Sequence, residues 1–335
     1  MITGIREHAH KVMTQVQFNG AGKSQLVASW HRCLLRHNLD PTMPTELRRL
    51  DAHELSRARQ GAAPLIRAFQ RALRDQKSAF PGQRVCALVT DANGIVLSAY
   101  RHGIDADCLA RMGLSQGYDW SEAHRGTNGV GTCLVSERPV TIRRDEHFYL
   151  PIAPMACVAA PIFGPDGELS GAFNLSLLSR TADSAFARQA LLFLAISVAR
   201  DIEKTLFVNA YPDCRIITMG DTSRSGVGLF AVDQDDVVIG ATRMARTLKG
   251  LTPQSLLKGI PASDIFEDNG KDSFAQAERA VLRRALLRTR GNVTAAADCL
   301  EISRATMKRK VGKHFTSPVS ATPQLRAIPA RHRPN

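Results

Sequence analysis

The chain has 335 residues, a net charge of +13 and 44% hydrophobic residues, which is enough for two or three hydrophobic cores. It has no run of eighteen apolar residues and no signal-peptide pattern, so we expect a soluble, cytoplasmic protein without membrane contact. The seven cysteines are dispersed without a Cys-x-x-Cys pair, which disfavours structural zinc and disulfides. A redox-sensing thiol stays an open alternative.

The positive charge is concentrated at the two ends of the chain. Residues 1–80 carry 13 basic and 6 acidic side chains, and residues 271–335 carry 14 and 4. Residues 81–270 carry 17 basic and 21 acidic side chains. Because basic surfaces attract nucleic-acid phosphates, we expect nucleic-acid contact at the termini. For the excess of basic residues in the first 80 positions, the alternative to nucleic-acid contact is a helical face that contacts only solvent.

Residues 1–80 are predicted to be helical. A helix containing Ser29–Cys33 is expected to end before Leu39-Asp40-Pro41, because the residue before a proline disfavours helix. The segment Gly20–Ser24 ends like a phosphate-binding loop, but Gln17 stands where the full pattern requires glycine. We therefore expect no nucleotide site in this region.

Residues 84–180 have the composition of strands and turns. Two hairpins are predicted, with strands at Val85–Val89 and Ile95–Ala99, and at Ala156–Phe163 and Glu168–Leu175. Between them, three glycines within Trp120–Leu134 suit a tight loop that leads into a short helix. The pattern indicates an α+β domain whose antiparallel sheet has one face covered by helices.

Two further patterns follow along the chain. The long amphipathic stretch Phe186–Val208 is typical of a helix that pairs with its copy in a homodimer, or packs on its own sheet. Residues 224–266 then predict strand Leu229–Val232, an acidic turn, strand Val237–Ile239 and a helix at Thr242–Lys249. This order resembles the start of a PAS domain, shortened or degenerate.

The segment from Phe274 to Phe315 carries the strongest functional signal. Its first helix has an apolar stripe of Val281, Leu282, Ala285 and Leu286 opposite several arginines, and ends at Gly291-Asn292. Thr294 is expected to cap a helix at Ala295–Leu300, and Ser303 a helix from Arg304 to about Lys313. Two short helices joined by the turn at Glu301-Ile302 predict a helix-turn-helix.

The third helix divides into two faces. Ile302, Met307 and Val311 can pack inward against the small Ala295, Ala296 and Ala297. The face left for a DNA groove consists of Ser303, Arg304, Thr306, Lys308, Arg309 and Lys310. Arginine can read guanine edges or contact phosphate, whereas lysine and hydroxyls mostly position the backbone. A solvated amphipathic helix pair is the alternative, but it does not explain the turn, caps and basic face together.

The motif G-N-V-T-A-A-A-D-C-L-E-I-S-R-A-T-M-K-R-K resembles the Fis-type helix-turn-helix of bacterial regulators. By position, the resemblance implies DNA contact by Thr294, Ser303, Arg304, Thr306, Lys308 and Arg309. Glu301 departs from the family pattern, which usually has glycine there. If this turn requires a positive φ, the glutamate costs about 1 kcal/mol.

A second resemblance covers residues 26–206. This stretch is similar to the GAF sensory region of acetoin-catabolism-type (AcoR-like) activators. The motifs that carry the similarity are S-W-x-R-C with L-D-P, G-T-N-G-V-G-T, D-E-H-F and P-I-F-G-P-D-G-E-L-S-G. A GAF domain implies a small ligand held between sheet and helices. The candidate effector-binding residues are Trp120, Thr127, Asn128, Thr132, His147 and Phe148. The alternative is that they form the fold's own loop and core.

The two resemblances imply five segments. We expect a helical region at 1–80, a GAF-like sensor at 81–208, a degenerate PAS-like segment at 209–268, a Fis-type helix-turn-helix at 272–315 and a disordered basic tail at 316–335. Residues 268–271 read as a polar linker. His147 has no second histidine at ligand spacing and no nucleophile–base pair is evident, so no metal, cofactor or catalytic residue is predicted.

The resemblance implies a dimeric transcription regulator that binds double-stranded DNA and responds to a small effector, with RNA polymerase as a candidate partner. AcoR-like activators carry an AAA+ ATPase between sensor and helix-turn-helix. Here only Leu206–Ser273 separates them and the G-A-F-T-G-A loop is absent, so we expect regulation without an ATPase. The first alternative is an accessory or architectural DNA-binding protein with a ligand-blind sensor, which modulates a full-length sigma-54 activator. An enzyme with a DNA-binding tail is the second.

Overall fold

The computed structural model describes residues 2–18, 24–75, 84–150, 156–177, 185–220, 226–266 and 274–315. The chain divides into two compact units, Met1–Ile265 and Phe266–Asn335. The expected polar linker at 268–271, the tail at 316–335 and residues 20–23 lie outside the described residues. Within the described ranges, no helix is both long and apolar enough to cross a membrane.

The first unit contains a five-stranded antiparallel sheet with the strand order β2-β1-β5-β4-β3. Its strands are β1 (Val85–Asp91), β2 (Val96–His102), β3 (Val140–Ile142), β4 (Ala156–Phe163) and β5 (Leu169–Leu177). Both predicted hairpins are confirmed, because β1 pairs with β2 and β4 pairs with β5. In the first hairpin, Asp91 Oδ1 accepts hydrogen bonds from the backbone nitrogens of Asn93 and Ile95, at 3.0 and 2.8 Å.

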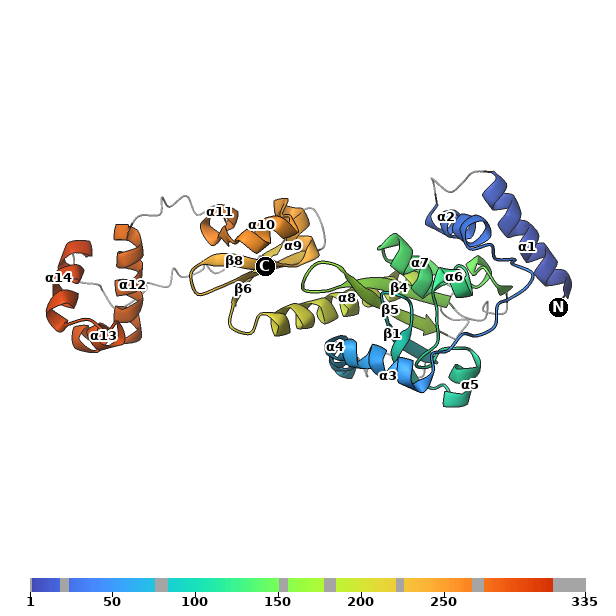
Figure 1. Ribbon diagram of the computed structural model, residues 1–335, viewed down its shortest axis with the longest axis horizontal. Coiled ribbons are helices and arrows are strands. Elements are labelled where there is room, and N and C mark those ends of the chain that lie inside the picture. Colours follow the sequence, from blue (N-terminus) through green and yellow to red (C-terminus); the bar gives the residue numbers. More distant parts are fainter. Residues whose placement is uncertain are drawn as a thin grey trace, which may run out of the picture. The chain divides into compact units, whose positions relative to one another are not determined.

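Helices cover both faces of this sheet, whereas the sequence predicted one covered face (Figure 1). Cys86 and Leu88 of β1 face one hydrophobic cluster, and Val85, Ala87 and Val89 face the other. The apolar run of β1 leaves no polar side for water, as in other strands buried on both faces. The helices are α1 (Ile2–Gln17), α2 (Gln25–His31), η2 (Arg32–Arg36), α3 (Ala52–Gly61), α4 (Ala63–Asp75), α5 (Ala106–Arg111), α6 (Glu122–Arg125), α7 (Gly129–Ser136), η4 (Arg144–Glu146) and α8 (Ala185–Ala210).

The N-terminal helices share the hydrophobic clusters of the sheet. Val12 of α1 and Trp30 of α2 belong to the cluster that contains Leu88. Phe69 of α4 packs in the opposite cluster, together with Ile202 of α8. The packing therefore continues across the boundary that the sequence suggested near residue 80.

A second, smaller sheet follows α8 in the chain. It is antiparallel and has the order β6-β7-β8-β9, with β6 (Arg215–Gly220), β7 (Val227–Val232), β8 (Val237–Ala241) and β9 (Ile260–Pro261). The helices α9 (Arg243–Lys249), α10 (Pro253–Lys258) and α11 (Ala262–Phe266) accompany it. The predicted strand-turn-strand-helix order is confirmed for β7, β8 and α9, while β6 and β9 were not predicted.

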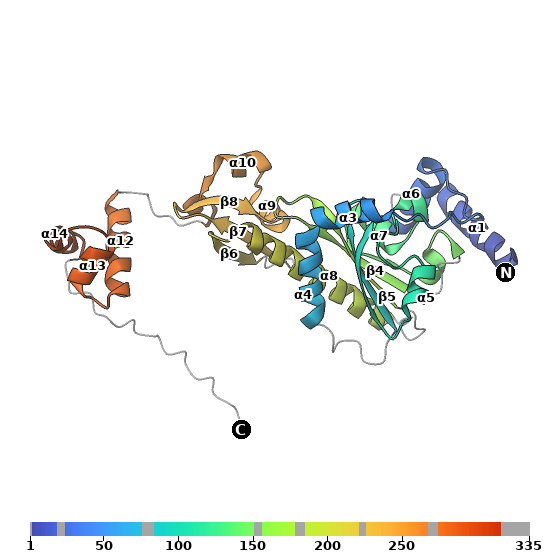
Figure 2. The ribbon, with the colours of Figure 1, turned by 60° about the horizontal axis from the view of Figure 1, so that its bottom comes forward.

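The second unit contains α12 (Phe274–Arg288), α13 (Val293–Cys299) and α14 (Arg304–His314), which pack against one another (Figure 2). Its buried core consists of Leu282, Ala285, Leu286, Ala296, Ala297 and Met307. Val281, which the sequence placed in the apolar stripe, is instead 40% exposed. It lies on the flank of the stripe, because the buried apolar positions of α12 in this core are Leu282, Ala285 and Leu286.

Candidate nucleic-acid interface and sensor core

The turn before α14 has the conformation that a helix-turn-helix requires. Glu301 has a φ of +50°, in the left-handed region, and the backbone nitrogen of Ile302 donates to the carbonyl of Ala297 at 3.1 Å. Ser303 then caps α14, as predicted, because its Oγ accepts from the backbone nitrogen of Thr306 at 3.1 Å. The glutamate therefore occupies a conformation that suits glycine better, at a cost of about 1 kcal/mol.

The cap of α13 differs from the sequence prediction. Asn292, not Thr294, occupies the N-cap position. Its Oδ1 accepts from the backbone nitrogens of Thr294 and Ala295, at 3.0 and 3.2 Å. Asparagine is among the strongest N-cap residues, so it begins the helix earlier and leaves Thr294 exposed within the first turn.

Three exposed cations lie on the outer surface of α14. Arg304, Lys308 and Arg309 are exposed, and we call these three residues the cationic stripe. Arg304 and Lys308 lie one turn apart on the same side of the helix, and Arg309 follows about 100° further round, while Met307 is buried. Of the other predicted DNA contacts, Thr294 and Ser303 are also exposed, while Thr306 is half-buried beside Ser303 Oγ.

Lys310 does not belong to this stripe. It is half-buried, and its ammonium group forms an ion pair with Glu278 on α12. The ring of His314 contacts the other oxygen of the same carboxylate. Lys310 and then His314 hold the pKa of Glu278 at about 2. The structure thus separates Lys310 from the other predicted DNA-contacting cations and gives it a bridge between α14 and α12.

The glycine-rich motif of the first unit builds a tight turn before α7. Asn128 caps this helix through its Oδ1, which accepts from the backbone nitrogen of Gly131 at 2.9 Å. Its Nδ2 donates to the carbonyls of Trp120 and Gly126 at 3.0 and 2.8 Å. Gly126 has a φ of +61°, and a Cβ there would lie 2.5 Å from Phe148 Cβ. Only glycine fits this position.

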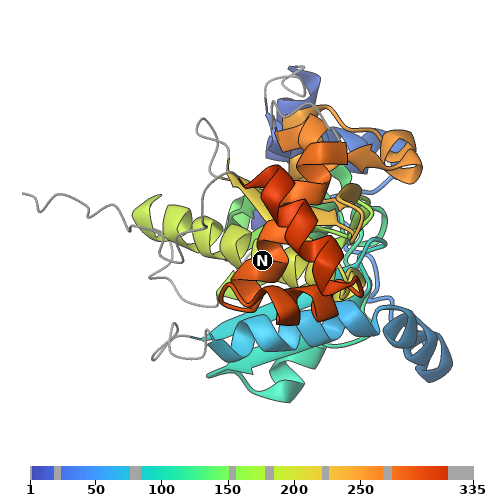
Figure 3. The same ribbon diagram turned by 90° about the vertical axis from the view of Figure 1, so that its left-hand side faces the viewer.

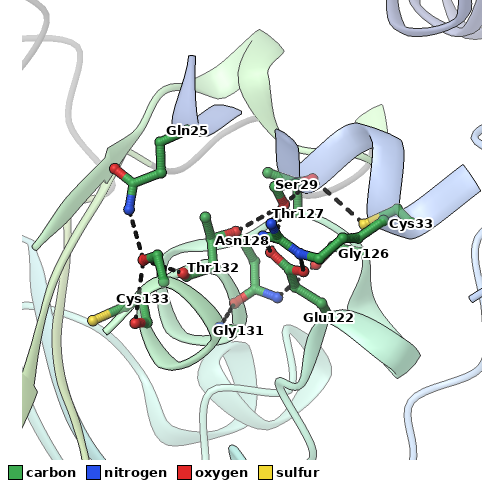
Figure 4. Close-up of polar contacts among 12 residues, drawn as sticks. Gln25, Ser29, Cys33, Glu122, Gly126, Thr127, Asn128, Gly131, Thr132 and Cys133 are labelled. Atoms are coloured by element: carbon green, nitrogen blue, oxygen red, sulfur yellow. Dashed lines mark hydrogen bonds and ion pairs between the residues drawn. The ribbon is translucent and has the colours of Figure 1, made fainter. Parts of the chain in front are cut away.

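A buried polar network joins α2 to this turn (Figure 4). The Glu122 carboxylate accepts from Ser29 Oγ at 2.5 Å and from Arg32 Nε and Nη2 at 2.7 and 2.8 Å. Ser29 Oγ also lies 2.7 Å from Thr127 Oγ1 and 3.1 Å from Thr132 Oγ1. Two parallel hydrogen bonds from one guanidinium fix a carboxylate strongly. The network therefore holds the N-terminal helices on the sheet.

All six predicted effector residues are buried in this region. Trp120 is 3% exposed and donates from Nε1 to the carbonyl of Gly113 at 2.6 Å. The other five are fully buried: Thr127, Asn128, Thr132, His147 and Phe148. The contacts of the polar residues support the reading in which the motif forms the fold's own loop and core. Effector binding by these residues stays a prediction.

The cavities of the first unit differ greatly in size. One cavity beside Trp120, Asn128 and Asn174 has about 10 Å³, the lower limit for one water molecule. Two pockets of about 290 and 380 Å³ lie between α8 and the smaller sheet unit, and both include Arg200, Glu203 and Met244. Within the described residues, no group of three or more His, Cys, Asp or Glu side chains could hold a metal ion.

A family model for the N-terminal domain of MimR matches residues 9–204, which is more than half of the chain. The chain belongs to the MimR N-terminal-domain family. The match begins within α1 and covers the later N-terminal helices and the five-stranded sheet, in agreement with their shared clusters. A second model, of Fis-family bacterial regulatory proteins, matches residues 273–314 and confirms the helix-turn-helix class.

Several curated relatives of this MimR-family chain are named as transcription regulators. The acetoin catabolism regulatory protein of Cupriavidus necator is 27% identical over 243 residues, which cover 71% of the chain and 36% of that protein. The propane 2-monooxygenase operon transcriptional activator MimR of Mycolicibacterium smegmatis is 32% identical over 145 residues, 43% of the chain and 24% of that protein. The matches thus span about a third or less of these relatives.

A solved structure shows the same fold. A chain of the E. coli DhaR(N)–DhaL complex superposes with a TM-score of 0.51 at 17% identity, covering 69% of this chain and 78% of that one. At this identity the likeness concerns the fold alone. It agrees with an antiparallel sheet covered by helices.

Proposed function

We propose that the chain is a sequence-specific DNA-binding transcription regulator whose MimR-type domain responds to a small effector. The observation that carries the proposal is the cationic stripe of Arg304, Lys308 and Arg309, which faces outward from a Fis-family helix-turn-helix. Met307 is buried in the core of the three helices, so α14 is held in a fixed orientation within this unit. A basic recognition helix is what enters a major groove.

The regulator acts as a homodimer in this proposal. Two helix-turn-helix units would then occupy successive major grooves, with half-site centres about 34 Å apart. Figure 3 shows the N-terminal turns of α8 projecting past the sheet. Phe186 and Phe193 lie seven residues apart there and are 85% and 69% exposed. Seven-residue spacing places both rings on one side of the helix, where a second copy of α8 could cover them.

Regulation would proceed without an ATPase domain in the chain. Residues 205–272 separate the two family matches, and the described part of this interval consists of the end of α8 and the smaller sheet with its helices. An effector would act by binding one state of the sensor more tightly than another, since only differential affinity shifts an equilibrium. RNA polymerase is the expected target of the DNA-bound protein.

The experiment is selection of bound duplexes from a random library, followed by a gel shift on the selected site. We expect the full chain to prefer that site over random competitor, and a chain ending at residue 265 to bind neither. A mobility shift by the truncated chain equal to that of the full chain would assign DNA binding to another surface. Sedimentation of the DNA-bound protein tests the homodimer separately.

The internal hydrogen bonds of the sensor motif favour a second candidate function. If Asn128 and Thr127 serve only the fold, the protein is an accessory DNA-binding protein whose sensor has no ligand. Titration of candidate metabolites during the gel shift separates the two functions. An effector changes the DNA affinity of a sensor-controlled regulator, and no metabolite changes that of the accessory protein.

A further inference from the structure

Helix α9, which accompanies the smaller sheet, docks onto one end of the larger sheet. Arg243 Nη2 on α9 lies 2.6 Å from an oxygen of Glu137, the residue that follows α7. The same guanidinium lies over the ring of Phe163 at the end of β4, with 4.1 Å to the ring centroid. These contacts bring α9 alongside α8 and the two β-sheets of the first unit together.

A pocket of about 290 Å³ lies beside these contacts, and residues of both α8 and α9 line it. It adjoins the pocket of about 380 Å³, because Ile196, Arg200, Glu203 and Met244 line both. An apolar cavity of about 150 Å³ already holds one benzene molecule, so the first pocket has room for a small organic compound. The flexible side chain of Met244 can adapt to its shape.

The wall of the first pocket is mainly apolar, and its residue types suit an aromatic ring. Phe163, Met244, Pro139 and Pro161 all line it, together with the guanidinium of Arg243. A thioether sulfur and a guanidinium both contact aromatic rings favourably. The stack of Arg243 on Phe163 shows that this guanidinium already accepts one ring. A planar ligand in the pocket would meet the same kinds of group.

The charged residues around this pocket compensate one another. Arg243 is paired with Glu137, and Arg200 and Glu203 are the other two charged residues that line it. Two cations therefore face two carboxyl groups, and neither sign is in large excess. Because an uncompensated charge is costly to bury, the balance favours a neutral ligand over an ion.

Glu203 supplies a polar group in the wall. Its Oε1 accepts from the backbone nitrogen of Phe163 at 2.9 Å, which fixes the carboxyl between α8 and β4. Burial raises the pKa of Glu203 to about 7, and the nearby Arg200 and Arg243 oppose the shift. Near neutral pH the carboxyl therefore alternates between a form that only accepts hydrogen bonds and one that also donates. A hydroxyl group suits both forms, because it can donate and accept.

We propose that this pocket binds a small neutral aromatic alcohol, with its ring against Met244 and Arg243 and its hydroxyl on the Glu203 carboxyl. None of the six residues that the sequence suggested for effector binding lines this pocket. The inference deepens the proposed effector response and rests on it, since this ligand would be the effector. It would contact α8 and α9 at once, and so act on the packing between them.

The test is calorimetric titration of the full chain, without DNA, with benzyl alcohol as the probe. Toluene keeps the ring without the hydroxyl, and cyclohexylmethanol keeps the hydroxyl without the aromatic ring. We expect benzyl alcohol to bind about tenfold more tightly than toluene, because toluene leaves the Glu203 carboxyl without a partner. It should bind about threefold more tightly than cyclohexylmethanol, which lacks the contacts of an aromatic face with sulfur and guanidinium.

A bulky side chain at position 247 assigns the binding to this pocket. Thr247 lines the pocket from an exposed position on α9, and its hydroxyl donates to the carbonyl of Arg243 within the same helix. Thr247→Trp should therefore fill the pocket and abolish binding while the core stays intact. Gln254→Trp on α10 is the matched control, because Gln254 is exposed and lines neither pocket. This control should bind benzyl alcohol as tightly as the parent.

Two substitutions of Glu203 test the hydroxyl contact. Glu203→Met removes the hydrogen-bonding group at similar length, so the preference for benzyl alcohol over toluene should disappear. Glu203→Gln keeps a group that donates and accepts, so most of the preference should remain. A merely structural role of Glu203 would weaken both ligands together and leave their ratio unchanged. Thermal unfolding of each variant checks that it folds.

Three results would overturn the assignment. One is binding of benzyl alcohol to Thr247→Trp as tight as to the parent, which places the ligand elsewhere. Another is binding of toluene or cyclohexylmethanol at least as tight as that of benzyl alcohol, which removes the aromatic alcohol as ligand class. Absence of binding by all three probes removes the site. Since DNA takes no part in the titration, none of these results alters the outcome of the gel shift on the selected site.

Discussion

Lys310 on α14 forms an ion pair with Glu278 on α12, which directs its ammonium group away from the cationic stripe of the same helix. Arg309, its neighbour in sequence, is exposed. Two adjacent basic residues thus have different surroundings, one facing solvent and one bridging two helices. This difference gives a matched pair of substitutions for separating DNA contact from domain stability.

Neutralising Arg309 should weaken DNA binding without unfolding the domain. If its guanidinium contacts a phosphate, Arg309→Gln reduces the slope of log affinity against log salt by about 1. Lys310→Gln should leave that slope nearly unchanged and lower the free energy of unfolding instead. Gel shifts over a salt series, with urea unfolding of both variants, make the comparison. Equal losses of salt slope would contradict the division of roles.

The Glu278 pairs predict a pH dependence of the C-terminal unit. Lys310 and His314 lower the pKa of Glu278 from its ordinary 4.5 to about 2. Because the folded-state pKa is depressed, the stabilisation is complete above about pH 4.5 and is lost as the pH falls toward 2. Glu278→Gln in a fragment of residues 266–335 should therefore be destabilised near pH 6 and match the parent near pH 2. A stability difference that is constant over this range would argue against the pairs.

Glycine at position 301 should stabilise the helix-turn-helix. Glu301 has a φ of +50°, and left-handed backbone costs a residue with a Cβ about 1 kcal/mol. Glu301→Gly should raise the free energy of unfolding by roughly this amount in urea titrations of the same fragment. Glu301→Ala is the control and should give no such gain, since alanine meets the same Cβ clash. A destabilised glycine variant would contradict the assigned turn.

Removing the α13 cap should cost more than removing the residue that the sequence suggested as cap. Asn292→Ala abolishes two hydrogen bonds to backbone nitrogens, and a lost N-cap costs about 1 kcal/mol. Thr294→Ala should change the free energy of unfolding by less than half of that, because Thr294 is exposed and caps nothing. Chemical denaturation ranks the two variants, and the reverse ranking would restore Thr294 as the cap.

Glu203 on α8 should make the first unit less stable as the pH rises. Its Oε1 accepts from the backbone nitrogen of Phe163 at 2.9 Å, and burial raises its pKa from 4.5 to about 7. Since the folded-state pKa is raised, stability is greatest below about pH 4.5 and decreases as the pH rises toward 7. Glu203→Gln keeps the acceptor and should stabilise the protein near pH 8 by roughly 1–2 kcal/mol. If Glu203→Gln gained no stability near pH 8 relative to pH 4.5, the raised pKa of Glu203 would be refuted.

The sequence predicted the elements that depend on local signals. The hairpin at Asp91–Gly94 and the Ser303 cap were found because their side chains bond to backbone only a few residues away. β6 was missed because its residues alternate irregularly between exposed and half-buried, which leaves no period-two pattern. Local chemistry thus accounts for the turns and caps, but not for weakly buried strands.

Long-range partners could not be predicted in the same way. Ser29 and Glu122 are 93 positions apart, and Arg32 and Glu122 are 90 apart, so nothing local marks them as a buried network. Arg125 was likewise not singled out, since the burial of its guanidinium appears only after folding. Lys310 looked equivalent to Arg309 until the packing of α12 placed Glu278 beside it.

The most direct measurement is the affinity of the full chain for its selected duplex at physiological salt, compared with a variant in which Arg304, Lys308 and Arg309 are all glutamine. We expect the parent to prefer the selected site over random duplex by about a thousandfold or more, and the variant to lose that preference while staying folded. If the variant bound the site as tightly as the parent, or if the parent showed no preference, the outer face of α14 would not be the DNA-binding surface.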